Sequence, residues 1–162
     1  MLFITDIYGE HHTKEDRDRI EELIRKRNKE IKYDYILSEE IGSNIALTKR
    51  DMELGIKNRI WGISSRTYEL GIELGIPVIG IDDWNEKIYK GTTLAQQFAE
   101  REKRMVEVIS EYSWKGNCAV IVGDTHLRSI ETKELGRKSP LHDSFSNHQG
   151  FTIIRSPLSE IK

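Results

Sequence analysis

The sequence predicts a single α/β domain, covering residues 1–162, with a mostly parallel central sheet of about five strands flanked by helices. Short apolar runs alternate with longer segments of helical periodicity, which is the order expected when right-handed crossovers join parallel strands. The apolar runs are continuous rather than alternating with polar residues, as is typical of strands that helices cover on both faces. A chain of 162 residues is also long enough for one substantial core.

The predicted strands are apolar runs at Leu2–Ile7, Tyr33–Leu37, Ile76–Ile81, Cys118–Val122 and Phe151–Arg155. The first four are followed within a few residues by carboxylates or histidine. Open α/β sheets bind ligands just outside the carboxyl ends of their strands. The repeat therefore predicts a polar site formed by four separate loops at one edge of the sheet.

Long helices are predicted between these strands. The first spans Thr13–Ile31, with Thr13 as its N-cap residue. A second helical region, Ser43–Leu74, is expected to break near Asn58–Gly62, and a third helix spans Thr93–Tyr112.

The chain after the fourth strand is predicted to hold one short helix. It spans Ser129–Leu135 and ends at Gly136, a residue suited to helix C-termini. The following stretch, Arg137–Gly150, has the composition of a loop, and both a lid over the site and a disordered surface loop are open interpretations.

The composition predicts a heavily charged surface and excludes several partners. Charged residues make up 32% of the chain, but the net charge is −2, so no attraction to nucleic acid or anionic lipid is expected. The single cysteine, Cys118, excludes a disulfide within the chain and favours the cytoplasm. We expect no signal peptide, because the N-terminus lacks a basic region and an apolar stretch of about 7–15 residues. We expect no membrane span, because no run of ~18 apolar residues occurs. The expected partner is a small-molecule or peptide substrate, and homo-oligomerisation is open.

Two Gly-x-x-His segments follow the first and fourth strands. In Gly9-Glu10-His11-His12 the glycine is expected to turn the backbone off the strand. Glutamate and histidine there suit metal ligation or a base with its orienting carboxylate, and an exposed loop that caps the next helix is the alternative. In Gly123-Asp124-Thr125-His126 the imidazole is expected to lie over the sheet edge, and a capping Asp or Thr beside an incidental histidine is the alternative.

Adjacent acids follow the second and third strands. Neighbouring side chains leave a strand on opposite faces, so one of Glu39 and Glu40 is expected to point into the site, unless the pair is only a polar strand end. Asp82 and Asp83 either cap the following turn or supply a ligand or orienting carboxylate.

The third helix carries two ionisable residues, Arg101 and Glu102, within its apolar stripe. An ionisable group in such a place is expected to be partly buried and paired. Arg101 is expected to neutralise acids at the sheet edge, or else to bury only its stem and extend its guanidinium to water.

In their order along the chain, these segments resemble the superfamily that joins TraB/PrgY-type pheromone-shutdown proteins, Tiki metalloproteases, erythromycin-esterase-like proteins and ChaN-like haem-binding proteins. The matching segments are Gly9–His12, Asp34–Glu39, Gly80–Asp82, Glu100–Met105 and Gly123–Leu127. From each adjacent pair of candidates, the resemblance selects His12, Glu39 and Asp82.

The resemblance implies a hydrolase that cleaves a peptide, ester or other acyl bond. Its site residues would be Glu10, His12, Glu39, Asp82, Arg101 and His126. In a metal-dependent form, His12 and His126 would bind Zn or Mn together with Glu39, or with Glu10 as the alternative, and the ion would supply hydroxide near neutral pH. In a metal-free form, His12 would activate water and Arg101 would stabilise the oxyanion.

Two other functions are open. A non-catalytic module of the same fold would bind haem or another ligand, with Tyr89, His142 and His148 as candidate contacts. A calcineurin-like phosphoesterase is suggested by Ile4–Gly9, although Tyr8 stands where that motif requires histidine.

Overall fold

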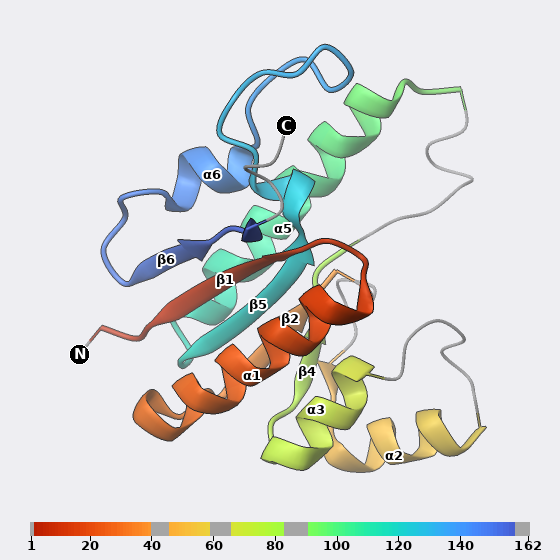
Figure 1. The fold of residues 1–162 in the computed structure, drawn as a ribbon, viewed down its shortest axis with the longest axis vertical. Coiled ribbons are helices and arrows are strands. Elements are labelled where there is room, and N and C mark those ends of the chain that lie inside the picture. Colours follow the sequence, from red (N-terminus) through yellow and green to blue (C-terminus); the bar gives the residue numbers. More distant parts are fainter. Residues whose placement is uncertain (1, 40–45, 59–65, 83–90, 158–162) are drawn as a thin grey trace.

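The computed structural model describes residues 2–39, 46–58, 66–82 and 91–157. The predicted fold class is confirmed, because a mostly parallel sheet lies between two layers of helices (Figure 1). Within these residues the sheet has six strands in the order β3-β4-β2-β5-β1-β6, and only the β3–β4 pair is antiparallel. The strands are β1 (Thr5–Glu10), β2 (Tyr35–Ser38), β3 (Ala46–Leu47), β4 (Val78–Gly80), β5 (Cys118–Gly123) and β6 (Phe151–Ile154).

Helices cover both faces of the sheet. They are α1 (Lys14–Ile31), α2 (Lys49–Asn58), α3 (Arg66–Leu74), α5 (Leu94–Ser113) and α6 (Pro140–Phe145), with a short 3-10 helix, η1 (Asp124–Leu127), after β5. In Figure 1, α1 and α3 lie in front of the sheet and α5 lies behind it.

Each face of the sheet has its own hydrophobic core. Because successive residues of a strand point to opposite faces, Ile36 of β2 packs with Ile20 of α1, while Leu37 packs with Met105 of α5. The central strands β1 and β5 are buried along their whole length, which fixes the position of the polar residues that follow them.

The two longest helices begin where the sequence predicts. The Thr13 hydroxyl accepts a hydrogen bond from the backbone N–H of Asp16 at 3.2 Å, which caps α1. At the start of α5, Thr93 and Gln96 form a reciprocal capping box. The cap at Thr13 was predicted from the sequence, whereas for α5 only the start near Thr93 was predicted and not the capping box.

The first strand is displaced from its predicted position. β1 begins at Thr5 and ends at Glu10, so Gly9 lies inside the strand instead of turning the chain away from it. The reason for glycine at this position is close approach: a Cβ atom on Gly9 would collide with the Asp124 carboxylate. The shift places Glu10 at the last paired position of β1, opposite Gly123.

Two helix predictions are wrong in part. The predicted helical region Ser43–Leu74 contains the strand β3 before α2 and α3, and most of its predicted break lies outside the described residues. The predicted helix at Ser129–Leu135 does not form, and α6 lies instead within the stretch predicted to be a loop. The Thr132 hydroxyl accepts from Leu135 N–H, so this segment closes as a turn.

None of the helices in the described part of the chain combines the length and hydropathy needed to cross a bilayer.

Candidate active site

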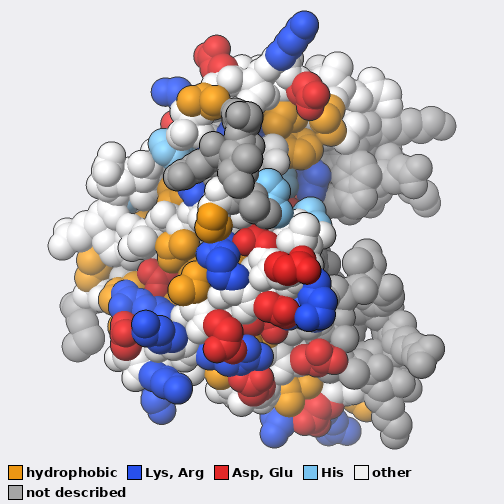
Figure 2. All heavy atoms as spheres, viewed as in Figure 1, with side chains coloured by type: hydrophobic (Ala, Val, Ile, Leu, Met, Phe, Trp, Pro, Cys, Tyr) orange, Lys and Arg blue, Asp and Glu red, His pale blue; other side chains and the backbone are white. Residues whose placement is uncertain are grey.

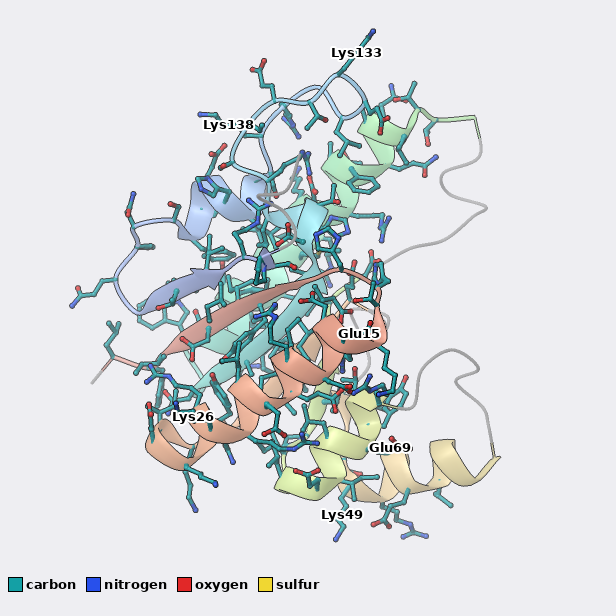
Figure 3. The ribbon with its side chains drawn as sticks, in the orientation of Figure 1. Glu15, Lys26, Lys49, Glu69, Lys133 and Lys138 are labelled. Carbon is teal, nitrogen blue, oxygen red and sulfur yellow. The ribbon has the colours of Figure 1, made fainter. Side chains whose placement is uncertain are left out.

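A polar cavity of about 280 Å³ lies at the carboxyl edge of the sheet. Its wall is formed by Glu10, His11, His12, Glu39, Phe98, Arg101, Gly123, Asp124, Thr125 and His126. In the space-filling view, histidine side chains lie at a hollow on the right of the molecule (Figure 2). The start of α1, marked by Glu15 in Figure 3, follows directly on the part of the wall that β1 supplies. A cavity therefore lies at the edge of the sheet where the sequence predicts the site.

Glu39 and His126 form the floor of this cavity. Glu39 Oε2 lies 3.0 Å from His126 Nε2, and Glu39 Oε1 accepts a hydrogen bond from the backbone N–H of Gly123. Arg101 Nη2 lies 3.8 Å from Glu39 Oε2. Burial raises the pKa of Glu39, but the hydrogen bond and charge of His126 outweigh burial, and the net pKa is lowered. Glu39 is therefore ionised at neutral pH.

The second nitrogen of His126 is held by another carboxylate. Its Nδ1 lies 2.9 Å from Glu102 Oε2, and Glu102 has no exposed surface. Glu39, His126 and Glu102 thus form a buried row. The Arg128 guanidinium donates two hydrogen bonds to the Glu102 carboxylate, at 2.5 and 3.0 Å. Burial lowers the pKa of His126, but the hydrogen bonds to Glu102 and Glu39 outweigh that effect and raise it to about 9. The imidazole is therefore charged at neutral pH.

Phe98 and Arg101, both on α5, form one side of the cavity. The Phe98 ring stacks on His126, with 4.8 Å between ring centroids, and the Arg101 guanidinium lies 5.5 Å from the Phe98 centroid. Arg101 also forms a bidentate pair with the buried Asp82, with its shortest bond at 2.7 Å. Asp82 therefore positions Arg101 through contact with its guanidinium, and it is absent from the cavity wall.

Glu10 and His12 form the opposite side. Glu10 is buried and pairs with the buried Arg17 at 3.3 Å. His12 is mostly exposed, and its Nδ1 lies 3.8 Å from Glu10 Oε1. Arg17 also donates to Glu21 and to Thr67, so Glu10 is tied to both α1 and α3.

The three sides meet over Gly123. A Cβ atom on this glycine would lie 2.9 Å from Glu39 Oε1, 3.6 Å from His12 Nε2 and 3.7 Å from His126 Cδ2. Glycine therefore leaves open a small volume that a carboxylate and two imidazoles surround. Its backbone angles, φ −58° and ψ 136°, are accessible to any residue, so open space is what the position requires.

Five of the six predicted site residues line the cavity. The sixth, Asp82, lies behind the wall and contacts Arg101. The sequence predicted no role in the site for Phe98, Glu102 or Arg128, although Glu102 was expected to be partly buried and paired. His11 also lines the cavity, and its Nε2 is buried with no hydrogen-bond partner among the described residues. The alternatives Glu40 and Asp83, and the candidate haem contact Tyr89, lie outside the described residues.

The other candidate residues lie away from the cavity wall. His148 stacks on Phe151 at the start of β6, and His142 is in α6. Asp6, the carboxylate of the phosphoesterase-like segment, accepts bonds from Tyr33 and Arg27 on the α1 face of the sheet.

The predicted zinc or manganese site requires at least three ligands at the cavity. Among the residues that the structure describes, no three His, Cys, Asp or Glu side chains are grouped to hold a metal ion. Both ring nitrogens of His126 already lie within hydrogen-bond distance of carboxylates, which favours a proton on each nitrogen over a bound metal. The metal site stays an untested prediction.

No protein-family model matches the sequence, and no curated protein matches it significantly. Among solved structures, the chain is similar to RRSP, a MARTX toxin effector domain from Vibrio vulnificus CMCP6, with a TM-score of 0.57 and 17% identity over 94% of this chain and 35% of that one. It is also similar to a structure described as bacterial protein toxins, with a TM-score of 0.52 and 13% identity over 85% of this chain and 31% of the other. The chain thus spans about a third of the length of these structures, and the likeness shows the fold alone.

The expected resemblance to the TraB, Tiki and erythromycin-esterase-like superfamily is wrong. The structural neighbours are bacterial toxin proteins, and no family model or curated protein of that superfamily matches the chain. Each matching segment was only a few residues long. Such segments recur wherever strands end at a polar sheet edge, so their order did not identify a family.

Proposed function

We propose that the chain is a hydrolase that cleaves an acyl bond, in a peptide or an ester, by acid–base chemistry of its own side chains. The observation that carries this proposal is the buried row Glu39–His126–Glu102, which ends in an open cavity. A histidine with a strongly shifted pKa, placed at the carboxyl edge of an α/β sheet, is a recognised mark of a catalytic site.

The proposed reaction begins at His12. Its Nε2 accepts a proton from water, and the hydroxide oxygen forms a bond to the acyl carbon. Glu10, next to Nδ1, stabilises the imidazolium that results. Arg101 and the charged His126 offset the negative charge that develops on the carbonyl oxygen.

The second step breaks the bond between the acyl carbon and the leaving group. The leaving group takes the proton that His12 received, so the reaction consumes one water and no other reactant. Glu39 has a positioning role in this scheme, because it keeps His126 charged and holds it over the open space above Gly123. The buried, unpartnered Nε2 of His11 is a candidate contact for a polar group of the substrate.

The charges around the cavity favour the metal-free form of this proposal. Each described carboxylate at or behind the cavity wall has a cationic side chain as partner: Glu10 with Arg17, Glu39 with His126, Asp82 with Arg101, Glu102 with Arg128 and Asp124 with Arg155. A site balanced in this way does not depend on a divalent ion to offset its negative charge.

The test measures product release from a panel of aryl esters and from a mixed peptide library. Glu39→Gln removes the charge that holds His126, and it is expected to lower kcat/KM at least about 100-fold. Gly123→Ala adds one methyl group at the centre of the cavity and is expected to lower kcat/KM at least about tenfold. The exposed residues Glu131 and Lys133 provide matched controls, Glu131→Gln and Lys133→Ala, which are expected to leave turnover unchanged.

Turnover is also expected to survive treatment with EDTA. Loss of activity in EDTA with recovery on adding Zn or Mn would replace the metal-free scheme by the metal-dependent one. Absence of turnover on every ester and peptide, or equal turnover by Glu39→Gln and the wild type, would count against hydrolysis at this cavity.

A further inference from the structure

One side of the polar cavity is apolar, and a single side chain supplies it. Among the described residues that line the cavity, Phe98 has the only apolar side chain, and the others are ionisable or polar residues and Gly123. The charged groups of this wall already pair with one another or with neighbouring charges, so an ionised substrate group would have to displace a partner that is in place. An apolar substrate group displaces no partner when it covers Phe98, so this ring is the part of the wall suited to select a substrate.

Three neighbours hold the Phe98 ring in place. The ring stacks on His126, with 4.8 Å between ring centroids and 26° between ring planes. The guanidinium carbons of Arg101 and Arg128 lie 5.5 and 5.9 Å from the Phe98 centroid, within the range of a cation–π interaction. Phe98 is only half-buried, so part of its surface is left for a ligand. A surface fixed in this way loses little conformational entropy when it binds.

The apolar surface continues from Phe98 along α5. Leu94 precedes Phe98 by four residues and therefore lies on the same face of the helix. Further along this face, Met105 and Ile109 have no exposed surface, whereas Leu94 is 50% exposed. The first turns of α5 extend past the ends of the strands (Figure 1), and hydrophobic side chains lie directly above the histidines of the hollow in Figure 2. We call this surface the Leu94–Phe98 strip.

The proposed reaction decides which part of a substrate faces this strip. An acyl carbon carries three substituents, which are the carbonyl oxygen, the leaving group and the acyl chain. In that reaction Arg101 offsets the charge on the carbonyl oxygen, and His12, on the β1 side of the cavity, supplies the proton of the leaving group. Arg101 follows Phe98 by three residues, so the two side chains are neighbours on α5. The acyl chain is therefore the substituent that lies beside Phe98.

We propose that the Leu94–Phe98 strip is the acyl-chain subsite of the cavity, and that the substrate is an acyl compound with an apolar chain on its carbonyl carbon. This inference rests on the proposed hydrolysis, because the positions of the carbonyl oxygen and the leaving group come from it. Phe98 contacts the part of the chain next to the carbonyl. Leu94, one helical turn or about 6 Å further along α5, contacts the far end of a longer chain. The aliphatic chain of an ester and the apolar side chain of a peptide residue share this chemistry.

The test measures kcat/KM for nitrophenyl esters and nitroanilides that carry the same straight acyl chains, from acetyl to octanoyl. The wild type is expected to gain about threefold per added methylene up to hexanoyl, in whichever of the two series it cleaves. Phe98→Ala is expected to reduce this gain to less than about 1.5-fold per methylene, and Phe98→Leu, which keeps an apolar side chain, is expected to retain it. Acetate esters of longer alcohols should show the same dependence on alcohol length in wild type and Phe98→Ala, because the leaving group lies on the His12 side.

Two leucines provide a matched pair of variants. Leu94→Ala is expected to lower the ratio of octanoyl to acetyl kcat/KM at least about threefold. Leu54 is 45% exposed on α2 and lies outside the cavity wall, and Leu54→Ala is expected to leave that ratio unchanged. If circular dichroism shows that Phe98→Ala does not fold, this pair decides, because both leucines are about half exposed. Equal ratios in Leu94→Ala and Leu54→Ala would then overturn the proposal.

Two outcomes in an active protein overturn the proposal. One is a wild type whose kcat/KM does not depend on acyl length, and the other is a Phe98→Ala variant that loses the same factor at every length, since the ring would then only position His126. Straight-chain methyl ketones, which have a carbonyl carbon and no leaving group, test the strip without turnover by NMR titration. Affinity that rises with ketone length in the wild type but not in Phe98→Ala supports the subsite even where the hydrolase proposal fails. Equal affinity for short and long ketones overturns the subsite, whatever the turnover.

Discussion

At the scale of single residues, His126 shows how neighbours decide what a side chain can do. An isolated histidine is about half charged near pH 6.5. Burial alone would favour the neutral form, but a carboxylate at each ring nitrogen reverses that preference. The residue that the sequence suggested as a base or a metal ligand is therefore, in this fold, a fixed positive charge beneath the cavity.

This charge gives the stability of the protein a defined pH dependence. The folded-state pKa of His126, about 9, lies above its ordinary value, so its contribution is complete below about pH 6.5 and is lost as the pH rises through 9. We expect the free energy of unfolding to fall by up to about 3 kcal/mol between pH 6 and pH 9.5. Urea denaturation at a series of pH values measures this change.

Two histidine variants separate this effect from general alkaline destabilisation. His126→Gln should flatten the pH dependence across that range, because the titrating group is gone. His142→Gln, in α6 and outside the cavity wall, should keep it. An equal fall in stability in wild type and His126→Gln would assign the dependence to other groups.

At the scale of elements, α5 is anchored to the end of β5 by charge as well as by its apolar face. Glu102 of α5 has no exposed surface and binds both His126 and Arg128, which flank the end of η1. A buried ion pair of this kind adds little net stability while intact, but removing one partner leaves the other charge stranded in the core.

Glu102→Ala is therefore expected to lower the free energy of unfolding by about 3–5 kcal/mol, measured by urea denaturation. The matched variant Glu107→Ala, on the same helix, breaks an exposed pair with Arg104 and is expected to cost less than about 1 kcal/mol. Adding Arg128→Met to Glu102→Ala should recover part of the loss, because it removes the stranded charge. If Glu102→Ala and Glu107→Ala lower the free energy of unfolding equally, the buried ion pairs of Glu102 do not anchor α5.

Element prediction succeeded where the deciding interactions were local and failed where they were not. The start of α1 is set by a hydrogen bond from the Asp16 N–H to the Thr13 hydroxyl, three residues apart, so the sequence alone predicted this N-cap. β3 depends instead on pairing with β4, more than 30 residues later, and no local periodicity marks a two-residue strand. The same distinction holds in the site. The strand ends predicted Glu39 and His126, but Glu102 reaches His126 only because α5 crosses the back of the sheet.

At the scale of the whole molecule, the two cores on either side of the sheet raise the question of whether they unfold as one. The prediction of a single domain implies that they do, because β1, β2 and β5 contribute side chains to both. Cys118, at the start of β5, offers a probe that lies between the two helix layers. It is fully buried, and burial is the main cause that raises its thiol pKa to about 12.

We expect Cys118 to react with an aromatic disulfide reagent only after global unfolding, slower than an exposed thiol by roughly the unfolding equilibrium constant. A Cys118→Ala protein that carries Lys133→Cys on the exposed loop should react at once and calibrates the reagent. Glu102→Ala weakens the α5 side, and Arg17→Met weakens the α1 side. In one cooperative domain, each variant speeds the labelling of Cys118 by the factor by which it raises the unfolding equilibrium constant. Labelling that responds to one variant and ignores the other would mean that the two layers open separately, and the single-domain prediction would then fail.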